Sequence, residues 1–138
     1  MKQAIVVDSN IVNKWFLRQN ETELEQSYDL YRKIKNGLVK AWAPAFLLIE
    51  VGNILLHKKN FSEKETNQII ERIQNSGISF VEFNSLYLKE LIRLSKLHGL
   101  TTYDCLYLFL AIQKNCQLVT ADKKLLDVKE ICVNLGVF

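Results

Sequence analysis

The segment TTYDCLYLFLAIQKNCQLVTADKKLL, residues 101–126, contains the pattern that decides the fold. A continuous apolar run, residues 106–112, follows two threonines that can begin a helix, and a second apolar segment occupies residues 118–120. The first run predicts a buried helix that begins near Tyr103, and the second predicts a short buried strand. A helix followed by a strand is the repeating unit of α/β folds.

Two aspartates stand at the edges of these apolar runs. Asp104 directly precedes the first run, and Asp122 follows the second. An ionised carboxylate that is removed from water is costly unless a counter-charge, hydrogen bonds or a metal ion compensates for the lost hydration. We therefore expect other parts of the chain to supply that compensation.

The alternation of strands and helices extends over the whole chain. Further strands are predicted at residues 4–7, 39–43, 78–83 and 131–135. Helices are predicted after Asp8, at residues 21–36 behind a capping box at 20–23, from Pro44, from a second capping box at 62–65, over residues 85–98, and briefly from Asp122. This pattern predicts an α/β fold, a three-layer α/β/α sandwich with a mostly parallel central sheet and right-handed crossovers.

The composition indicates one compact domain, residues 1–138. The chain is 49% hydrophobic and 24% charged, and it contains one proline, which argues against disorder. A formal net charge of +3 permits a polyanionic partner without identifying one. The three cysteines show no CxxC spacing, so we interpret them as small buried side chains in a reducing environment.

No targeting or membrane segment is expected. The apolar part of the N-terminal MKQAIVVD is too short for the core of a secretion signal. The longest apolar run, residues 106–112, is far shorter than the roughly 20 residues of a membrane helix. We therefore expect a cytoplasmic protein that does not associate with membranes.

Four carboxylates lie beside segments that are predicted to be buried: Asp8, Glu50, Asp104 and Asp122. Asp8 and Asp122 both follow strands, and ligands of open parallel sheets bind outside the carboxyl ends of the strands. Like charges that converge there raise one another's pKa unless a cation binds them, which predicts a divalent metal site. Because no His or Cys has ligand spacing, the oxygen donors favour Mg²⁺ or Mn²⁺ over zinc.

A simpler explanation exists for three of these acids. Asp104 and Asp122 are each placed at a predicted helix start, where an acid caps the helix or interacts with its dipole. Asp8 is a common turn former. Glu50 is harder to explain in this way, because it lies in the middle of a helix between Ile49 and Val51.

Four blocks of the sequence resemble a known family. VVDSNIVNKWF (6–16), PAFLLIEVGNIL (44–55), LTTYDCLYLFLA (100–111) and LVTADKKL (118–125) are similar, in order and approximate spacing, to the signature blocks of the PIN-domain ribonucleases. The resemblance is closest to the VapC-type toxins of prokaryotic toxin–antitoxin pairs. It implies that the four acids are catalytic and metal-binding, with Asn10 and Thr120 in support. Many relatives have Ser or Thr in place of Asn10, whose amide oxygen can still support a ligand or water.

The same resemblance implies the activity and the partners. The expected reaction is Mg²⁺- or Mn²⁺-dependent hydrolysis of RNA phosphodiester bonds by water, which leaves a 5′-phosphate, and the expected partners are a cognate antitoxin and a second copy of the chain. The basic residues nearest to the motif blocks are the candidates for RNA contact: Lys14, Arg18, Lys58, Lys59, Lys123 and Lys124. Trp15 and Phe16 are candidates for base stacking, although such residues more often belong to a core or a partner interface.

Several alternatives remain open at this point. The chain can be a stand-alone RNA-processing nuclease, or a non-catalytic module of the same fold that binds RNA or protein. A phosphatase of related architecture needs a DxD motif after the first strand, where this chain has Asp8-Ser9-Asn10. No second signal supports acid–base catalysis by His57 or His98, and Tyr103 and Tyr107 are interpreted as packing residues.

Overall fold

The central element of the fold is one parallel sheet. The computed structural model describes residues 2–17 and 23–137, and within them the sheet has the strand order β3-β2-β1-β4-β5. All four neighbouring pairs are parallel. The strands are β1 (Gln3–Val7), β2 (Val39–Pro44), β3 (Ser79–Val81), β4 (Gln117–Val119) and β5 (Cys132–Val133). The predicted parallel sheet is confirmed, although the third and fifth strands are shorter than their apolar segments.

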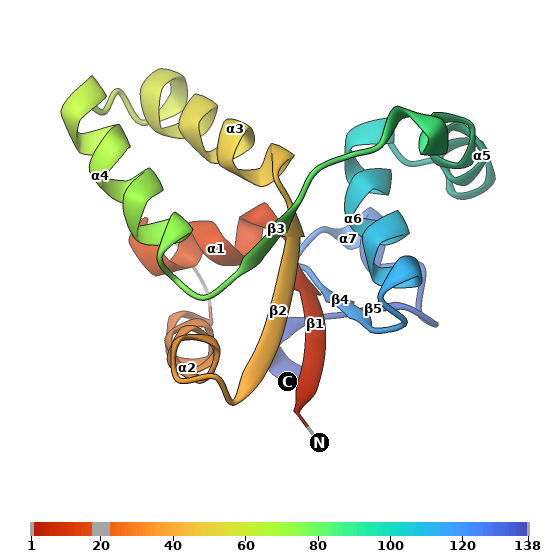
Figure 1. Ribbon diagram of the computed structural model, residues 1–138, viewed down its shortest axis with the longest axis horizontal. Coiled ribbons are helices and arrows are strands. Elements are labelled where there is room, and N and C mark those ends of the chain that lie inside the picture. The colour runs from red at the N-terminus through yellow and green to blue at the C-terminus, as the bar shows by residue number, and fades with distance from the viewer. Residues whose placement is uncertain (1, 18–22, 138) are drawn as a thin grey trace.

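Helices cover both faces of this sheet, so the predicted three-layer α/β/α sandwich is confirmed (Figure 1). On one side lie α1 and α2, with α3 and α4 beyond them. On the other side α6 packs against β1, β2 and β4, and α5 packs on α6. The helices are α1 (Ser9–Phe16), α2 (Leu24–Lys35), α3 (Phe46–Asn53), α4 (Glu63–Gln74), α5 (Leu88–His98), α6 (Thr102–Gln113) and α7 (Lys123–Leu126). A single π-helical turn, Ile54–Lys58, continues α3, and short 3-10 turns occupy Ser85–Tyr87 and Leu135–Val137.

The core explains why the quoted segment has so few polar residues. Ile5, Val6 and Val7 of β1 are fully buried, as expected for a strand covered on both faces. Helix α6 lies between the sheet and α5, so Leu108 and Ala111 are fully buried as well. The described cysteines carry free thiols, and burial raises the pKa of Cys105 to about 11 and that of Cys132 to about 12.

Helix starts follow the predicted caps where the chain is described. The Thr101 side chain caps α6, and Ser62 with Glu65 forms a capping box at α4. The capping box predicted at residues 20–23 lies largely outside the described residues, and α2 begins at Leu24. None of the helices within residues 2–17 and 23–137 combines the length and the hydropathy of a membrane span.

The strand order determines where a ligand site can form. The chain passes from β1 to β2 and β3 in one direction, and α5 and α6 then return it to β4 on the other side of β1. The connections that leave β1 and β4 therefore run to opposite sides, and the carboxyl ends of two such neighbouring strands are where ligands of open α/β sheets bind. Asp8 directly follows β1, and Asp122 follows β4 after two residues.

Candidate functional site

Asp8 lies at the junction of β1 and α1, and its carboxylate is almost completely buried. The residue is 5% exposed. Its Oδ1 atom accepts a hydrogen bond from the Ser9 N–H at 2.7 Å, and its Oδ2 atom accepts one from the Thr120 hydroxyl at 2.7 Å. The Asp8 N–H donates to the Val119 carbonyl at 3.1 Å. Both the side chain and the backbone of Asp8 therefore join the ends of β1 and β4.

Asn10 and Thr120 extend this connection toward Asp122. The Asn10 amide donates to Asp8 Oδ2 at 3.3 Å and to Thr120 Oγ1 at 3.4 Å, and its oxygen accepts the Ala121 N–H at 3.1 Å. Thr120 Oγ1 also accepts the Asp122 N–H at 3.0 Å. Both residues expected in support of the carboxylates thus contact Asp8 directly. The amide of Asn10 makes bonds in both directions, as donor and as acceptor.

Glu50 lies on α3, on the same side of the sheet as α1, and it contacts α6 on the other side. It is half-buried, and its Oε1 atom accepts a hydrogen bond from the Tyr107 hydroxyl on α6. Tyr107, which the sequence predicts to be a packing residue, is buried and in addition donates a hydrogen bond to this carboxylate. Its spacing from Asp104 was the available signal, because residues three apart on a helix share a face. The neighbouring Tyr103 is 60% exposed and stacks on Phe46, with ring centroids 5.1 Å apart.

The two remaining acids differ in their relation to the helix starts. Asp104 is in the first turn of α6, but the cap is Thr101, whose hydroxyl accepts the Asp104 N–H at 3.1 Å. Asp122 is itself a cap, since its Oδ1 atom accepts the N–H groups of Lys124 at 2.8 Å and Leu125 at 3.2 Å. Capping therefore accounts for Asp122, whereas Asp104 is not the cap but lies in the first turn of α6, where its charge interacts favourably with the helix dipole.

The environment of Asp8 disfavours its negative charge. Burial raises the pKa of Asp8 to about 7, and the charges of Glu50 and Asp104 raise it further against the hydrogen bonds from Thr120 and Ser9, which lower it. A carboxyl group of this kind is only partly ionised at neutral pH.

Glu50 and Asp104 show the same tendency. Burial raises the pKa of Glu50, and the nearby charge of Asp104 adds to the increase, whereas the Tyr107 hydroxyl opposes it. Burial also raises the pKa of Asp104; its hydrogen bond with Thr101 lowers it, the charge of Asp122 raises it and Lys124 lowers it. Asp8, Glu50, Asp104 and Asp122, which we call the carboxylate site, are therefore linked in pairs by repulsion.

The donor chemistry of this site fits a hydrated Mg²⁺ or Mn²⁺ ion. Carboxylate, amide and hydroxyl oxygens are the ligands that such ions prefer. Among the described residues, no group of three or more His, Cys, Asp and Glu side chains is arranged to hold a metal ion. Mg²⁺ usually keeps several waters and binds through only one or two carboxylates, so its chemistry does not require such a cage.

The basic residues proposed for RNA contact differ in accessibility. Lys58, Lys59, Lys123 and Lys124 are exposed, and Lys124 is near enough to Asp104 to affect its pKa. Lys14 is only 4% exposed on α1, and its burial argues against contact with RNA at the surface. Arg18 lies outside the described residues.

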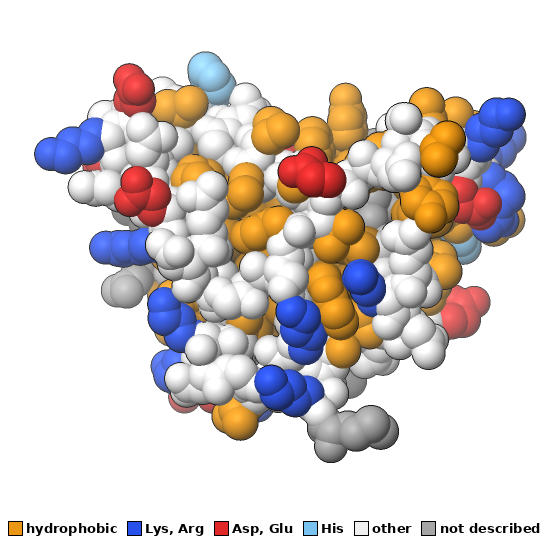
Figure 2. Space-filling model, in the orientation of Figure 1, with side chains coloured by type: hydrophobic (Ala, Val, Ile, Leu, Met, Phe, Trp, Pro, Cys, Tyr) orange, Lys and Arg blue, Asp and Glu red, His pale blue; other side chains and the backbone are white. Residues whose placement is uncertain are grey.

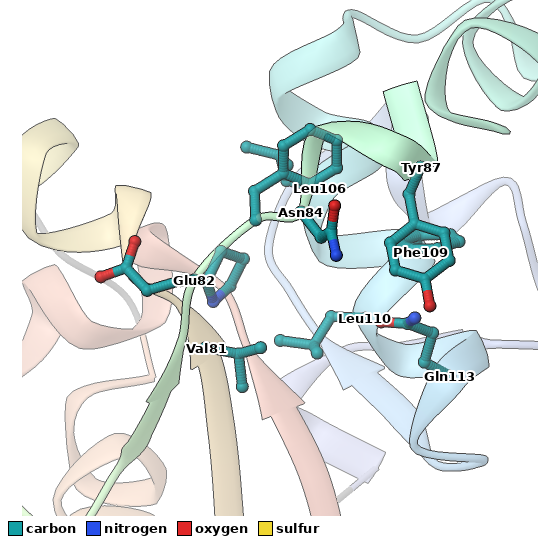
Figure 3. Close-up of a pocket in the computed structure, with 10 residues that line it drawn as sticks. Val81, Glu82, Asn84, Tyr87, Leu106, Phe109, Leu110 and Gln113 are labelled. Carbon is teal, nitrogen blue, oxygen red and sulfur yellow. The ribbon is translucent and has the colours of Figure 1, made fainter. Parts of the chain in front are cut away.

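A separate pocket of about 170 Å³ opens between α6 and the segment that follows β3 (Figure 3). Its lining is mostly apolar and includes Val81, Tyr87, Leu106, Phe109 and Leu110. None of the four carboxylates lines it. The pocket could not be predicted from the sequence, because its walls are ordinary apolar side chains from distant segments.

The raised pKa of Asp8 predicts an unusual pH dependence of stability. Between the ordinary Asp pKa of 3.8 and about 7, the folded chain binds the proton more tightly than the unfolded chain. This contribution to the free energy of unfolding is complete below pH 3.8 and disappears as the pH rises through 7, a loss on the order of 4 kcal/mol. Urea unfolding in EDTA at pH 5 and pH 8 should show a smaller loss for Asp8→Asn than for the wild type, and an equal loss would contradict the assignment.

Comparisons with known proteins agree with the fold. The model of the PIN domain family matches residues 5–131. No curated protein matches the sequence. Among the similar solved structures, PAE2754 from Pyrobaculum aerophilum has a TM-score of 0.69 and 21% identity over 99% of this chain and 93% of that one. A chain of VapBC2 from Rickettsia felis has a TM-score of 0.67 and 20% identity over 96% of this chain and 98% of that one. That complex was solved bound to a DNA fragment from its own promoter. At such identities the two structures show a shared fold, whereas the family match covers nearly the whole sequence, and the chain therefore belongs to the PIN domain family.

Proposed function

We propose that this protein is a Mg²⁺- or Mn²⁺-dependent endoribonuclease and the toxin of a type II toxin–antitoxin pair. PIN domains are generally nucleases. The observation that supports the proposal best is the carboxylate site: burial and mutual repulsion raise the pKa values of Asp8, Glu50 and Asp104, and the charge of Asp122 contributes to the repulsion at Asp104. The arrangement supports hydrolysis more than a binding module, because binding RNA does not require buried repelling carboxylates.

One or two of the four carboxylates would bind the metal ion directly, the others would hold its water molecules, and the neighbouring polar residues would keep the carboxylates in place. Bound there, a divalent ion lowers the pKa of a bound water molecule and stabilises negative charge on phosphoryl oxygens. Thr120 and Asn10 keep Asp8 in place through the hydrogen bonds described above. Lys123 and Lys124 are exposed beside Asp122 and would interact with the phosphates of RNA.

An antitoxin site is supported by the groove between α1, α2 and α4. Trp15 stacks edge-to-face on Tyr31 with ring centroids 4.9 Å apart, and Trp15 Nε1 donates to the Ser27 carbonyl at 2.9 Å. A groove lined by aromatic rings and arginines fits an apolar partner segment that carries acidic side chains. Its lining consists of Trp15, Phe16, Tyr28, Tyr31, Arg32 and Arg72. The similarity to VapBC2, a pair of this kind by its name, motivates the proposal that the occupant is an antitoxin.

A second copy of the chain has a different apolar surface available. Exposed apolar side chains gather over α5 and the segment before it, at the upper right of Figure 2. Leu86 is 83% exposed, Ile92 is 53% exposed and Leu88 is also exposed. Phe83, exposed as well, lines the pocket of Figure 3. We assign this surface to the homodimer that the family resemblance implies, because exposed apolar surface favours association.

Asp104→Asn tests the nuclease assignment. The change removes one negative charge and keeps the size of the side chain, and Thr101 still caps α6. RNA cleavage should fall at least a hundredfold, while the melting temperature in EDTA should stay unchanged or rise because repulsion is relieved. The exposed Asp127 provides a matched control, since Asp127→Asn should cleave RNA like the wild type. Near-normal cleavage by Asp104→Asn would remove Asp104 from the site.

Arg72→Glu tests the antitoxin groove. Arg72 lines the groove, and Arg93 on α5 does not, so Arg93→Glu is the charge-matched control. The small protein encoded next to this chain should copurify with the wild type and with Arg93→Glu, and its affinity for Arg72→Glu should be at least tenfold weaker. A neighbouring protein that fails to bind, or that binds both variants equally, would argue against an antitoxin in this groove.

A further inference from the structure

Tyr107 is an unusual core residue, because its ring is buried while its hydroxyl is hydrogen-bonded to a carboxylate. The residue is 1% exposed, and its hydroxyl donates to Glu50 Oε1. The two residues are 57 positions apart in the sequence and belong to helices on opposite sides of the sheet. A buried tyrosine that only filled space could be replaced by phenylalanine without loss to the site.

The tyrosine side of this hydrogen bond is rigid. Helix α6 packs against β1, β2 and β4, and its start is capped by Thr101. Asp104 and Tyr107 are three residues apart, so the same face of α6 presents a carboxylate and a hydroxyl to the site. The hydroxyl is therefore carried by a helix that packs between the sheet and α5.

The glutamate side is less constrained by its own helix. Helix α3 packs mainly on α1 and α4, its N-cap residue Ala45 makes no side-chain capping bond, and its end passes into the π-helical turn. Ile49, next to Glu50, is 67% exposed. A long glutamate side chain at such a position has several accessible rotamers unless another group fixes it.

We propose that Tyr107 is a positioning residue of the carboxylate site. Its hydroxyl fixes the Glu50 carboxylate from the opposite side of the sheet, and the second oxygen of Glu50 is left for the metal ion or its water. This inference rests on the proposed function. A phenol is protonated at neutral pH, so the Tyr107 hydroxyl acts as a donor to the Glu50 carboxylate. A hydrogen bond to a charged acceptor is among the stronger ones in proteins.

Tyr107→Phe removes the hydroxyl alone. We expect the kcat for RNA cleavage to fall about ten- to a hundredfold, the KM for RNA to stay the same, and the Kd for Mn²⁺ measured by calorimetry to rise several-fold. Tyr103→Phe is the control on the same helix, because its ring stacks on Phe46 and 60% of the residue is exposed. It should leave all three quantities unchanged. Unchanged Mn²⁺ affinity and kcat in Tyr107→Phe would overturn the proposal.

A double-mutant cycle with Glu50→Ala separates positioning from simple packing. If Tyr107 acts through Glu50, Tyr107→Phe in the Glu50→Ala background should cause no further loss of Mn²⁺ affinity or of residual cleavage. Fully additive losses would overturn the proposal. The same cycle on urea unfolding in EDTA measures the contact without metal or RNA, and a coupling of zero there would also overturn it. A wild type that neither binds Mn²⁺ nor cleaves RNA would instead contradict the proposed function.

Discussion

The hydrogen bond from the Thr120 hydroxyl to the buried Asp8 carboxylate is the contact on which the rest of the site depends. It joins residues 112 positions apart, at the carboxyl ends of β1 and β4. Among the described strands, this is where the connections from two neighbouring strands run to opposite sides. The hydroxyl also accepts the Asp122 N–H, so one oxygen atom fixes the relative positions of the first and last carboxylates. The parallel pairing of β1 and β4 sets the register of the two segments, and this hydrogen bond connects the side chains at their ends.

Burial of Asp8 has an electrostatic consequence that no described side chain fully offsets. Its hydrogen bonds favour the ionised form, yet burial and the charges of Glu50 and Asp104 still raise its pKa to about 7. A hydrated divalent cation would remove this penalty for several carboxylates at once, and one or two direct ligands are enough for Mg²⁺. In the folded chain the carboxylates of Asp8, Glu50 and Asp104 repel one another, and a metal ion would relieve this repulsion. The stability of the protein is thus connected with its proposed chemistry.

Much of the fold could be predicted because local patterns agree with it. Strands β1 and β4 appear in the sequence as short apolar runs, and Thr101 and Ser62 mark helix starts at the described positions. The four acids can be named as candidates from the sequence because each lies beside an apolar segment. The role of Tyr107 could not be read in the same way, since an aromatic residue in an apolar helix looks like core until Glu50 is placed opposite its hydroxyl. The burial of Lys14 is likewise a tertiary effect.

The most direct measurement of the central claim is RNA cleavage by the purified chain during metal removal and return. The Asp104→Asn protein, purified in parallel, reports any contaminating ribonuclease. If the carboxylate site works through a divalent ion, EDTA should abolish cleavage and a slight excess of Mg²⁺ or Mn²⁺ should restore it fully, with 5′-phosphate on the products. Undiminished cleavage in EDTA by the wild type, together with none by the Asp104→Asn preparation, would contradict the account.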